Sequence, residues 1–124
     1  MTARVLIVDD LPMMRQALRS VLEEAGYVVA GEAIDGNQGV LGYMQHKPDV
    51  VLLDIVMPKL DGIAALKQII RIDPGAKVIM CSALGEQSLI FRAIQLGARD
   101  FIVKPFRPER VVESVRQATA YAAS

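Results

Sequence analysis

The chain has 124 residues, which is the usual size of one domain and leaves no room for a second. Hydrophobic residues make up 52% of it and charged residues 23%, a balance that excludes a disordered tail. Its 14 basic residues balance 14 acidic ones, so no net charge attracts it to nucleic acid or to a membrane surface.

The single cysteine, Cys81, excludes an internal disulfide and a cysteine-based zinc cluster. No apolar run approaches the roughly 18 to 20 residues that span a bilayer. Residues 1–4 lead into an apolar run without a signal-peptide pattern. We therefore expect a cytoplasmic protein that contacts neither membrane nor nucleic acid directly.

Five apolar runs are too short and too rich in β-branched residues for buried helices. Three of them are continuous rather than alternating, as in strands that are covered on both faces of a parallel sheet. The runs predict strands at residues 5–8, 28–30, 50–53, 78–81 and 101–103.

The segments between the first four strands have helical periodicity. The first apolar stripe covers residues 14–25 and stops at Gly26. A weaker stripe, loosened by glycines, lies at residues 40–44. The third stripe, residues 63–70, follows Asp61, which is placed to cap the helix.

Two more helical stripes follow, at residues 90–97 and at residues 111–122. Pro108 suits the first turn of the last helix, and residues 121–124 are expected to end that helix. Alternation of five strands with five helices predicts an α/β doubly wound parallel sheet with right-handed crossovers. The leading strand order for this single-domain (βα)5 fold is the flavodoxin-like 2-1-3-4-5.

In such folds ligands bind outside the carboxyl ends of the strands, beside the switch point between the first and third strands. Four of the five predicted strands end in polar residues, namely Asp9-Asp10, Asp54, Ser82 and Lys104-Pro105. Because the predicted order makes these four strands neighbours, we expect the polar groups to converge on one patch.

Three carboxylates in one shallow pocket repel one another. At about 5 Å and an effective dielectric near 20, each close pair costs roughly 3 kcal/mol. Lys104 would supply one positive charge. Mg²⁺, which prefers carboxylate and carbonyl oxygens and retains several waters, would supply the rest. Zinc is not expected, because this edge of the sheet offers no histidine or thiol.

Such a site can also accept a phosphoryl group, because an aspartate oxygen is a competent nucleophile that forms an acyl phosphate. Catalysis of that transfer is mainly positioning and charge neutralisation. Asp54, on the central strand, is the best nucleophile candidate, whereas the adjacent Asp9 and Asp10 suit the metal. Lys104 and the Ser82 hydroxyl would each bind a phosphoryl oxygen.

Four motifs in the right order resemble the receiver domain of two-component response regulators. They are VLIVDD at 5–10, DIVMP at 54–58 with LDG at 60–62, CSA at 81–83 and FIVKPF at 101–106. The resemblance covers essentially the whole chain and is closest to the stand-alone chemotaxis regulators. It implies a single receiver domain, residues 1–124, to which a sensor histidine kinase of the chemotaxis type transfers a phosphoryl group.

The resemblance also implies the metal ligands. Mg²⁺ would be held by Asp10, Asp54 and the backbone carbonyl of Val56, with Asp9 acting through a metal-bound water. Val56 departs from the family pattern because it has no polar side chain at a position that tunes the lifetime of the phosphate. The protein would be a phosphoacceptor switch that takes part only in its own phosphorylation and autodephosphorylation, and not an enzyme with a separate substrate.

The resemblance further implies that Ser82 and Phe101 form the switch pair. The Ser82 hydroxyl moves toward the phosphate, and the Phe101 ring turns inward into the space that the hydroxyl leaves. The face formed by the fourth helix, fifth strand and fifth helix would then bind the flagellar motor switch or another output protein, and a phosphatase is a further candidate partner. The peptide bond before Pro105 would be cis, which aims Lys104 into the pocket.

Other interpretations compete with this one. A receiver cut from a longer regulator with a DNA-binding or enzymatic output domain would look the same. A flavin-binding protein would need a Gly/Ser/Thr-rich phosphate loop where residues 9–12 read DDLP, and a haloacid-dehalogenase-type phosphatase expects its nucleophile after the first strand. No P-loop motif occurs. Taken alone, Asp9 and Asp10 fit helix capping equally well, and Ser82 fits a turn.

Overall fold

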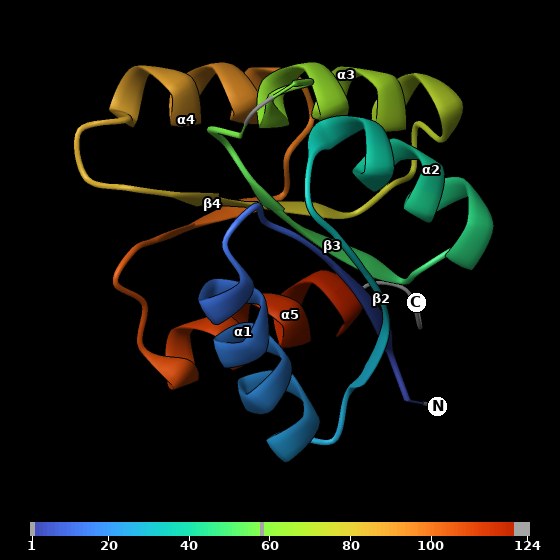
Figure 1. Cartoon of the computed structure of the whole chain (residues 1–124), viewed down its shortest axis with the longest axis vertical. Helices are drawn as coiled ribbons and strands as arrows, with labels where there is room; N and C mark the ends of the chain where they lie inside the picture. Colours follow the sequence, from blue (N-terminus) through green and yellow to red (C-terminus); the bar gives the residue numbers. More distant parts are fainter. Residues whose placement is uncertain (1, 58, 121–124) are drawn as a thin grey trace.

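A five-stranded parallel sheet forms the centre of the protein (Figure 1), whose computed structural model describes residues 2–57 and 59–120. The strands are β1 (Arg4–Val8), β2 (Val28–Ala33), β3 (Val50–Asp54), β4 (Val78–Ser82) and β5 (Asp100–Val103). Their order is β2-β1-β3-β4-β5 and every neighbouring pair is parallel. The predicted flavodoxin-like order is confirmed.

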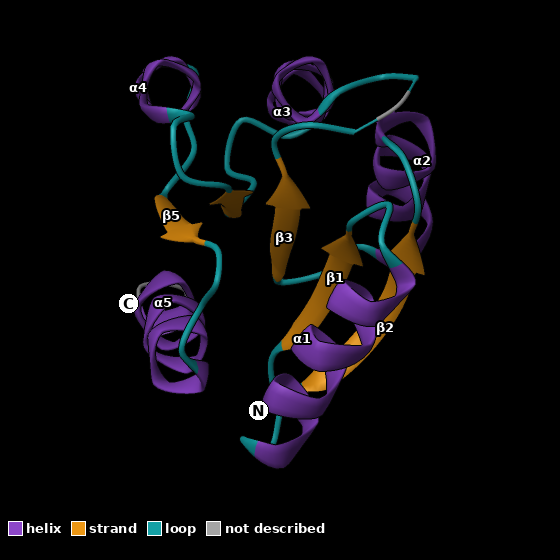
Figure 2. Ribbon diagram, turned by 60° about the vertical axis from the view of Figure 1, so that its left-hand side comes forward, coloured by secondary structure: helices purple, strands orange, loops and turns teal. Residues whose placement is uncertain are grey.

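Five helices cover both faces of this sheet. They are α1 (Pro12–Glu24), α2 (Gly36–His46), α3 (Gly62–Ile72), α4 (Gln87–Gln95) and α5 (Pro108–Ala120). Figure 2 shows α1 and α5 on one side of the sheet and α2, α3 and α4 on the other. None of the helices in the described part of the chain is long and apolar enough to cross a bilayer.

The two faces of the sheet carry separate cores, and β1 contributes to both. Val5 and Ile7 pack against α1 and α5, whereas Leu6 and Val8 pack against the helices on the opposite face. All four side chains are at most 1% exposed. Burial on both faces is the physical reason why this strand is a continuous apolar run.

The edge strand β2 is longer than predicted, because it continues through Glu32 to Ala33. Residues 28–32 are half-buried or exposed, as an edge strand allows, whereas Ala33 is buried. A polar residue such as Glu32 therefore does not end the strand. The Glu32 carboxylate lies on the α1 side, where it pairs with Arg15 at 3.1 Å and with Arg19 at 2.7 Å. These ion pairs hold α1 over the edge of the sheet.

The predicted helix boundaries agree with the structure at three positions. The Asp61 carboxylate caps α3 by accepting a hydrogen bond from the Ala64 N–H at 2.9 Å. Pro108 is the first residue of α5, and Gly26, with a φ of +92°, follows α1 in the left-handed region. Each boundary depends on local chain chemistry, which a sequence displays directly.

Four predicted stripe positions are wrong, because Ala25, Met44, Ile94 and Gly97 are all exposed. Ala25 lies beyond the last turn of α1 and is exposed. Ile94 is 43% exposed, because α4 buries only Ala93 fully. The last predicted turn, residues 121–124, lies outside the described residues.

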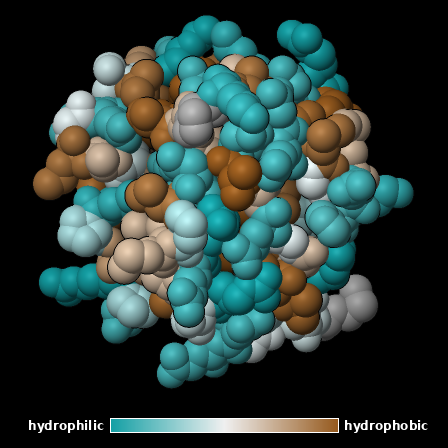
Figure 3. Space-filling model, in the orientation of Figure 1, coloured by the Kyte–Doolittle hydropathy of each residue, from teal (hydrophilic) through white to brown (hydrophobic). Residues whose placement is uncertain are grey.

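On the face seen in Figure 3, hydrophobic residues form small groups separated by polar ones.

Candidate functional site

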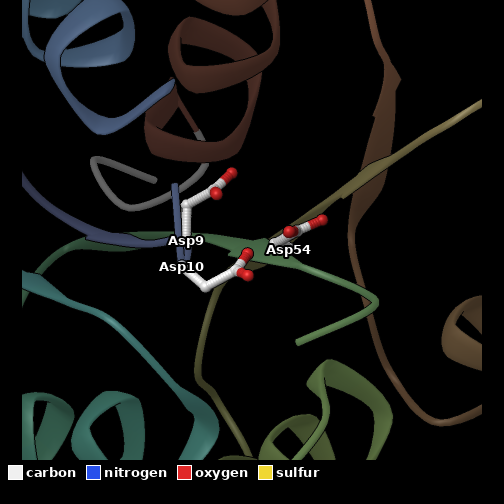
Figure 4. Close-up of side chains that lie close together, drawn as sticks. All are labelled: Asp9, Asp10 and Asp54. Carbon is white, nitrogen blue, oxygen red and sulfur yellow. The ribbon is translucent and has the colours of Figure 1, made fainter. Parts of the chain in front are cut away.

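Three carboxylates gather at the carboxyl ends of the two central strands (Figure 4). Asp9 and Asp10 follow β1, and Asp54 is the last residue of β3. One oxygen of each carboxylate lies within 4.8 Å of the others. Asp9 and Asp54 are only 1% and 6% exposed, and Asp10 is half-buried. The structure therefore brings the three predicted carboxylates together in a largely buried pocket.

Lys104 provides the positive charge of this pocket. It directly follows β5, and its backbone N–H donates to the carbonyl of Ser82 at 2.7 Å. Its Nζ lies 3.1 Å from Asp9 Oδ2 and 3.2 Å from Asp54 Oδ1. The peptide bond between Lys104 and Pro105 is cis, as the resemblance to receiver domains implies. One lysine thus contacts carboxylates from both central strands.

Burial and the close contacts between charges alter the proton affinities of Asp54 and Lys104. It raises the pKa of Asp54 to about 6, although Lys104 pulls that pKa down, and the neighbouring Asp9 raises it further. Burial alone would lower the pKa of Lys104, but the attraction of Asp54 and Asp9 outweighs it, so the pKa of Lys104 rises. Near neutral pH the pocket therefore holds more negative than positive charge.

The donor set of the pocket fits Mg²⁺. Carboxylate oxygens are hard ligands, and a divalent cation would relieve the repulsion that remains after pairing with Lys104. Asp9, Asp10 and Asp54 can supply these oxygens. Val56 lies in the loop after β3 with an exposed side chain, and its carbonyl stays a predicted ligand. Burial raises the pKa of the Cys81 thiol in neighbouring β4 to about 12, which disfavours a thiolate-bound metal.

Ser82 brings a hydroxyl to the same edge of the sheet without a partner for it. It is the last residue of β4, where it pairs with Val103 of β5, and it is fully buried. Within residues 2–57 and 59–120, its Oγ has no hydrogen-bond partner. A buried hydroxyl without a partner is costly, so this one is available to a ligand oxygen. The turn interpretation of Ser82 is wrong, because the residue is paired within the sheet.

Helix capping does not explain the aspartate pair after β1. The N-cap of α1 is Leu11, and no side chain caps it. Asp9 Oδ1 instead accepts a hydrogen bond from the Leu11 N–H at 2.9 Å, which shapes the turn before the helix. Asp10 accepts no hydrogen bond from any described residue, so its carboxylate is free for a ligand.

Phe101 lies on β5, outside the acidic pocket. Its ring is 36% exposed and lines a groove of about 390 Å³ between β5 and α4. Phe91, which falls off the buried stripe of α4, is 66% exposed and lines the same groove. The loop that directly follows Ser82 forms part of the groove, because Ala83, Leu84 and Gly85 line it.

Comparison with known proteins identifies the family. The family described as "Response regulator receiver domain" matches residues 5–116. The chain belongs to this receiver domain family. The receiver domain is 52% identical over 119 residues to chemotaxis protein CheY of Thermotoga maritima, covering 96% of this chain and 99% of that protein. It is 50% identical over 117 residues to CheY of Bacillus subtilis, covering 94% and 98%.

A solved structure is similar as well. A complex of CheX and CheY with BeF₃ and Mg²⁺ from Borrelia burgdorferi contains a chain that is 39% identical to the receiver domain. The match has a TM-score of 0.89 and covers 93% of this chain and 87% of that one. The receiver fold and the similarity to chemotaxis regulators are therefore both established.

One residue that positions the acidic pocket of the receiver domain escaped the sequence interpretation. Gly62 begins α3 and donates its N–H to the carbonyl of Ile55 at 2.7 Å. A Cβ at this position would lie 2.0 Å from the backbone oxygen of Asp54. The Asp61-Gly62 dipeptide is a recognisable turn and cap signal. The approach to Asp54 becomes visible only when α3 is placed on the sheet.

We expect Gly62→Ala to lower the free energy of unfolding by about 1 to 3 kcal/mol, because the added methyl displaces backbone on both sides of the contact. Urea unfolding followed by circular dichroism measures this loss. Gly75→Ala is the matched control, since a methyl there meets only Asp73 Oδ1, at 3.4 Å. Equal stability of the two variants would contradict the close approach.

Proposed function

We propose that Asp54 accepts a phosphoryl group from a histidine kinase and that this transfer switches a partner-binding face in chemotaxis signalling. The single observation that carries the proposal is the Asp54 carboxylate, buried beside two further carboxylates and 3.2 Å from the Lys104 Nζ. Membership of the receiver family and the 50–52% identity to chemotaxis proteins support it.

The transfer is a displacement at phosphorus. An Asp54 oxygen forms the new O–P bond while the N–P bond of a kinase phosphohistidine breaks, and the electron pair of that bond stays on the imidazole nitrogen, which takes a proton from water. Bound Mg²⁺ would supply charge neutralisation to the phosphoryl oxygens. Lys104 pairs with one of these oxygens, and the Ser82 hydroxyl donates to another.

The output step follows from the position of Ser82. Movement of its hydroxyl toward the phosphoryl group leaves space in the interior, into which the exposed Phe101 ring can turn. This rotation would reshape the groove between β5 and α4 and with it the face that includes α5. We propose this face as the docking site for the flagellar motor switch or another output protein, and the kinase and a phosphatase as the other partners.

Acetyl phosphate tests the proposal without a kinase. After incubation with acetyl phosphate and Mg²⁺, the intact mass of the protein should increase by one phosphoryl group. Asp54→Asn and metal-free protein should show no increase. An equal gain in Asp54→Asn would place the phosphoryl group elsewhere. No gain in the wild type, even with a histidine kinase, would refute the function.

Mg²⁺ affinity should fall as the pH falls below about 6. Asp54, whose pKa is raised to about 6 in the free protein, must lose its proton to bind the cation. Each pH unit below that value should weaken binding by up to about tenfold, and above pH 7 this contribution should level off. Calorimetric Mg²⁺ titrations from pH 5 to pH 8 measure the profile.

Asp54→Asn is the control for this pH profile. The variant lacks the titrating carboxylate, so its weaker Mg²⁺ binding should change little around pH 6. A wild-type affinity that is constant between pH 5 and pH 8 would contradict the proposed metal ligand.

A further inference from the structure

The loop between β4 and α4 is held by one side chain. Ala83, Leu84 and Gly85 are exposed, and Gly85 has a φ of +91°. Glu86, at the N-cap position of α4, turns back toward the strand, and its Oε1 accepts a hydrogen bond from the Ala83 N–H at 2.7 Å. Across residues 2–57 and 59–120, no other hydrogen bond engages the N–H groups of residues 83–85.

This hydrogen bond lies in the loop that connects Ser82 with the groove. Ala83 directly follows Ser82, whose buried Oγ has no partner within the described residues. Ala83, Leu84 and Gly85 also line the groove together with the exposed Phe101. A displacement of Ser82 therefore pulls on the Ala83 N–H, and a displacement of the loop changes the walls of the groove.

We propose that Glu86 is a positioning residue that holds the β4–α4 loop in its resting conformation. The inference rests on the proposed function, because it concerns the step in which Ser82 moves toward a group on Asp54. An interaction made only in the resting state opposes that step, and its removal shifts the population toward the switched state. The contact between Glu86 and Ala83 thus sets how readily a group on Asp54 converts the domain from the resting to the switched state.

Beryllofluoride with Mg²⁺, which imitates a phosphoryl group on a carboxylate, is a suitable probe. We expect Glu86→Ala to bind beryllofluoride roughly threefold to tenfold more tightly than the wild type, the range for the net loss of one ordinary hydrogen bond at an exposed site. In probe-free Glu86→Ala, the amide signals of Leu84 and Phe101 in ¹H–¹⁵N spectra should move toward their positions in the bound wild type.

Glu86→Gln separates the hydrogen bond from the charge. The glutamine oxygen can accept the same hydrogen bond, so this variant should return to near wild-type affinity and amide signals. Glu24→Ala, which removes an exposed glutamate from α1, should behave like the wild type. Unchanged amide signals of β1 and β3 residues will show that Glu86→Ala is folded.

Each outcome separates the two proposals. If the wild type and every variant fail to bind beryllofluoride with Mg²⁺, the proposed function fails. If the wild type binds it and Glu86→Ala binds equally or less tightly, the positioning role of Glu86 is wrong and the function stands. The positioning role is also wrong if Glu86→Gln matches Glu86→Ala, because the effect would then come from the charge.

Discussion

In metal-free protein at pH 7, Asp54→Asn should raise the free energy of unfolding by about 2 to 3 kcal/mol. In the folded state the pKa of Asp54 rises from 3.8 to about 6, chiefly because the carboxylate is buried. Each pKa unit corresponds to about 1.4 kcal/mol. Ionised Asp54 therefore destabilises the fold at neutral pH, and a neutral asparagine of similar shape removes that destabilisation.

The sign of this effect can be checked against pH. Between about pH 4 and pH 6 the folded protein binds a proton that the unfolded chain does not, so stability falls as the pH rises through this range and levels off above it. Urea unfolding should therefore show a large difference between wild type and Asp54→Asn at pH 7 and almost none at pH 4. Glu24→Gln, at an exposed site, should show none at either pH. A less stable Asp54→Asn at pH 7 would contradict the raised pKa.

The complementary change, Lys104→Ala, should lower the stability of the metal-free protein by about 2 to 3 kcal/mol at pH 7. The variant leaves Asp9 and Asp54 buried without the ammonium group that lies 3.1 to 3.2 Å from them. Thermal unfolding with and without Mg²⁺ measures the effect. Because the cation replaces the missing positive charge, added Mg²⁺ should stabilise Lys104→Ala more than it stabilises the wild type.

Lys67→Ala is the control for this prediction, because Lys67 is exposed on α3 and forms no ion pair with a described residue. It should change stability by less than about 0.5 kcal/mol. If Lys104→Ala and Lys67→Ala are equally stable without metal, the lysine contributes nothing to the balance of charge in the pocket.

The central strands could be predicted because burial on both faces leaves continuous apolar runs, as in β1, β3 and β4. The end of β2 could not, since the polar Glu32 lies within this edge strand, where arginines of α1 pair with it. The exposure of Ile94 could not be predicted from the sequence either. Helical periodicity identifies an apolar face, but how much of it α4 buries depends on where the helix lies against the sheet.

Some features of the acidic pocket could likewise be predicted from the sequence, and others could not. The strand-end positions of Asp9, Asp54 and Lys104 follow from alternation and strand order, so their convergence could be predicted before any distance was known. The unpartnered hydroxyl of Ser82 could not, because a missing partner is a property of the packed surroundings. The contact of Glu86 with Ala83 also leaves no sequence signal, since glutamate near a helix start is common.

The ion pair between Lys104 and Asp9 joins residues 95 positions apart in the chain. The acidic pocket therefore has its counter-charge only after β5 has docked on the edge of the sheet. A nascent chain on the ribosome, or a fragment that lacks the last strand, carries the carboxylates without the lysine. In such incomplete molecules the lysine does not offset the repulsion between Asp9 and Asp54, so the charge balance of the pocket depends on a complete sheet.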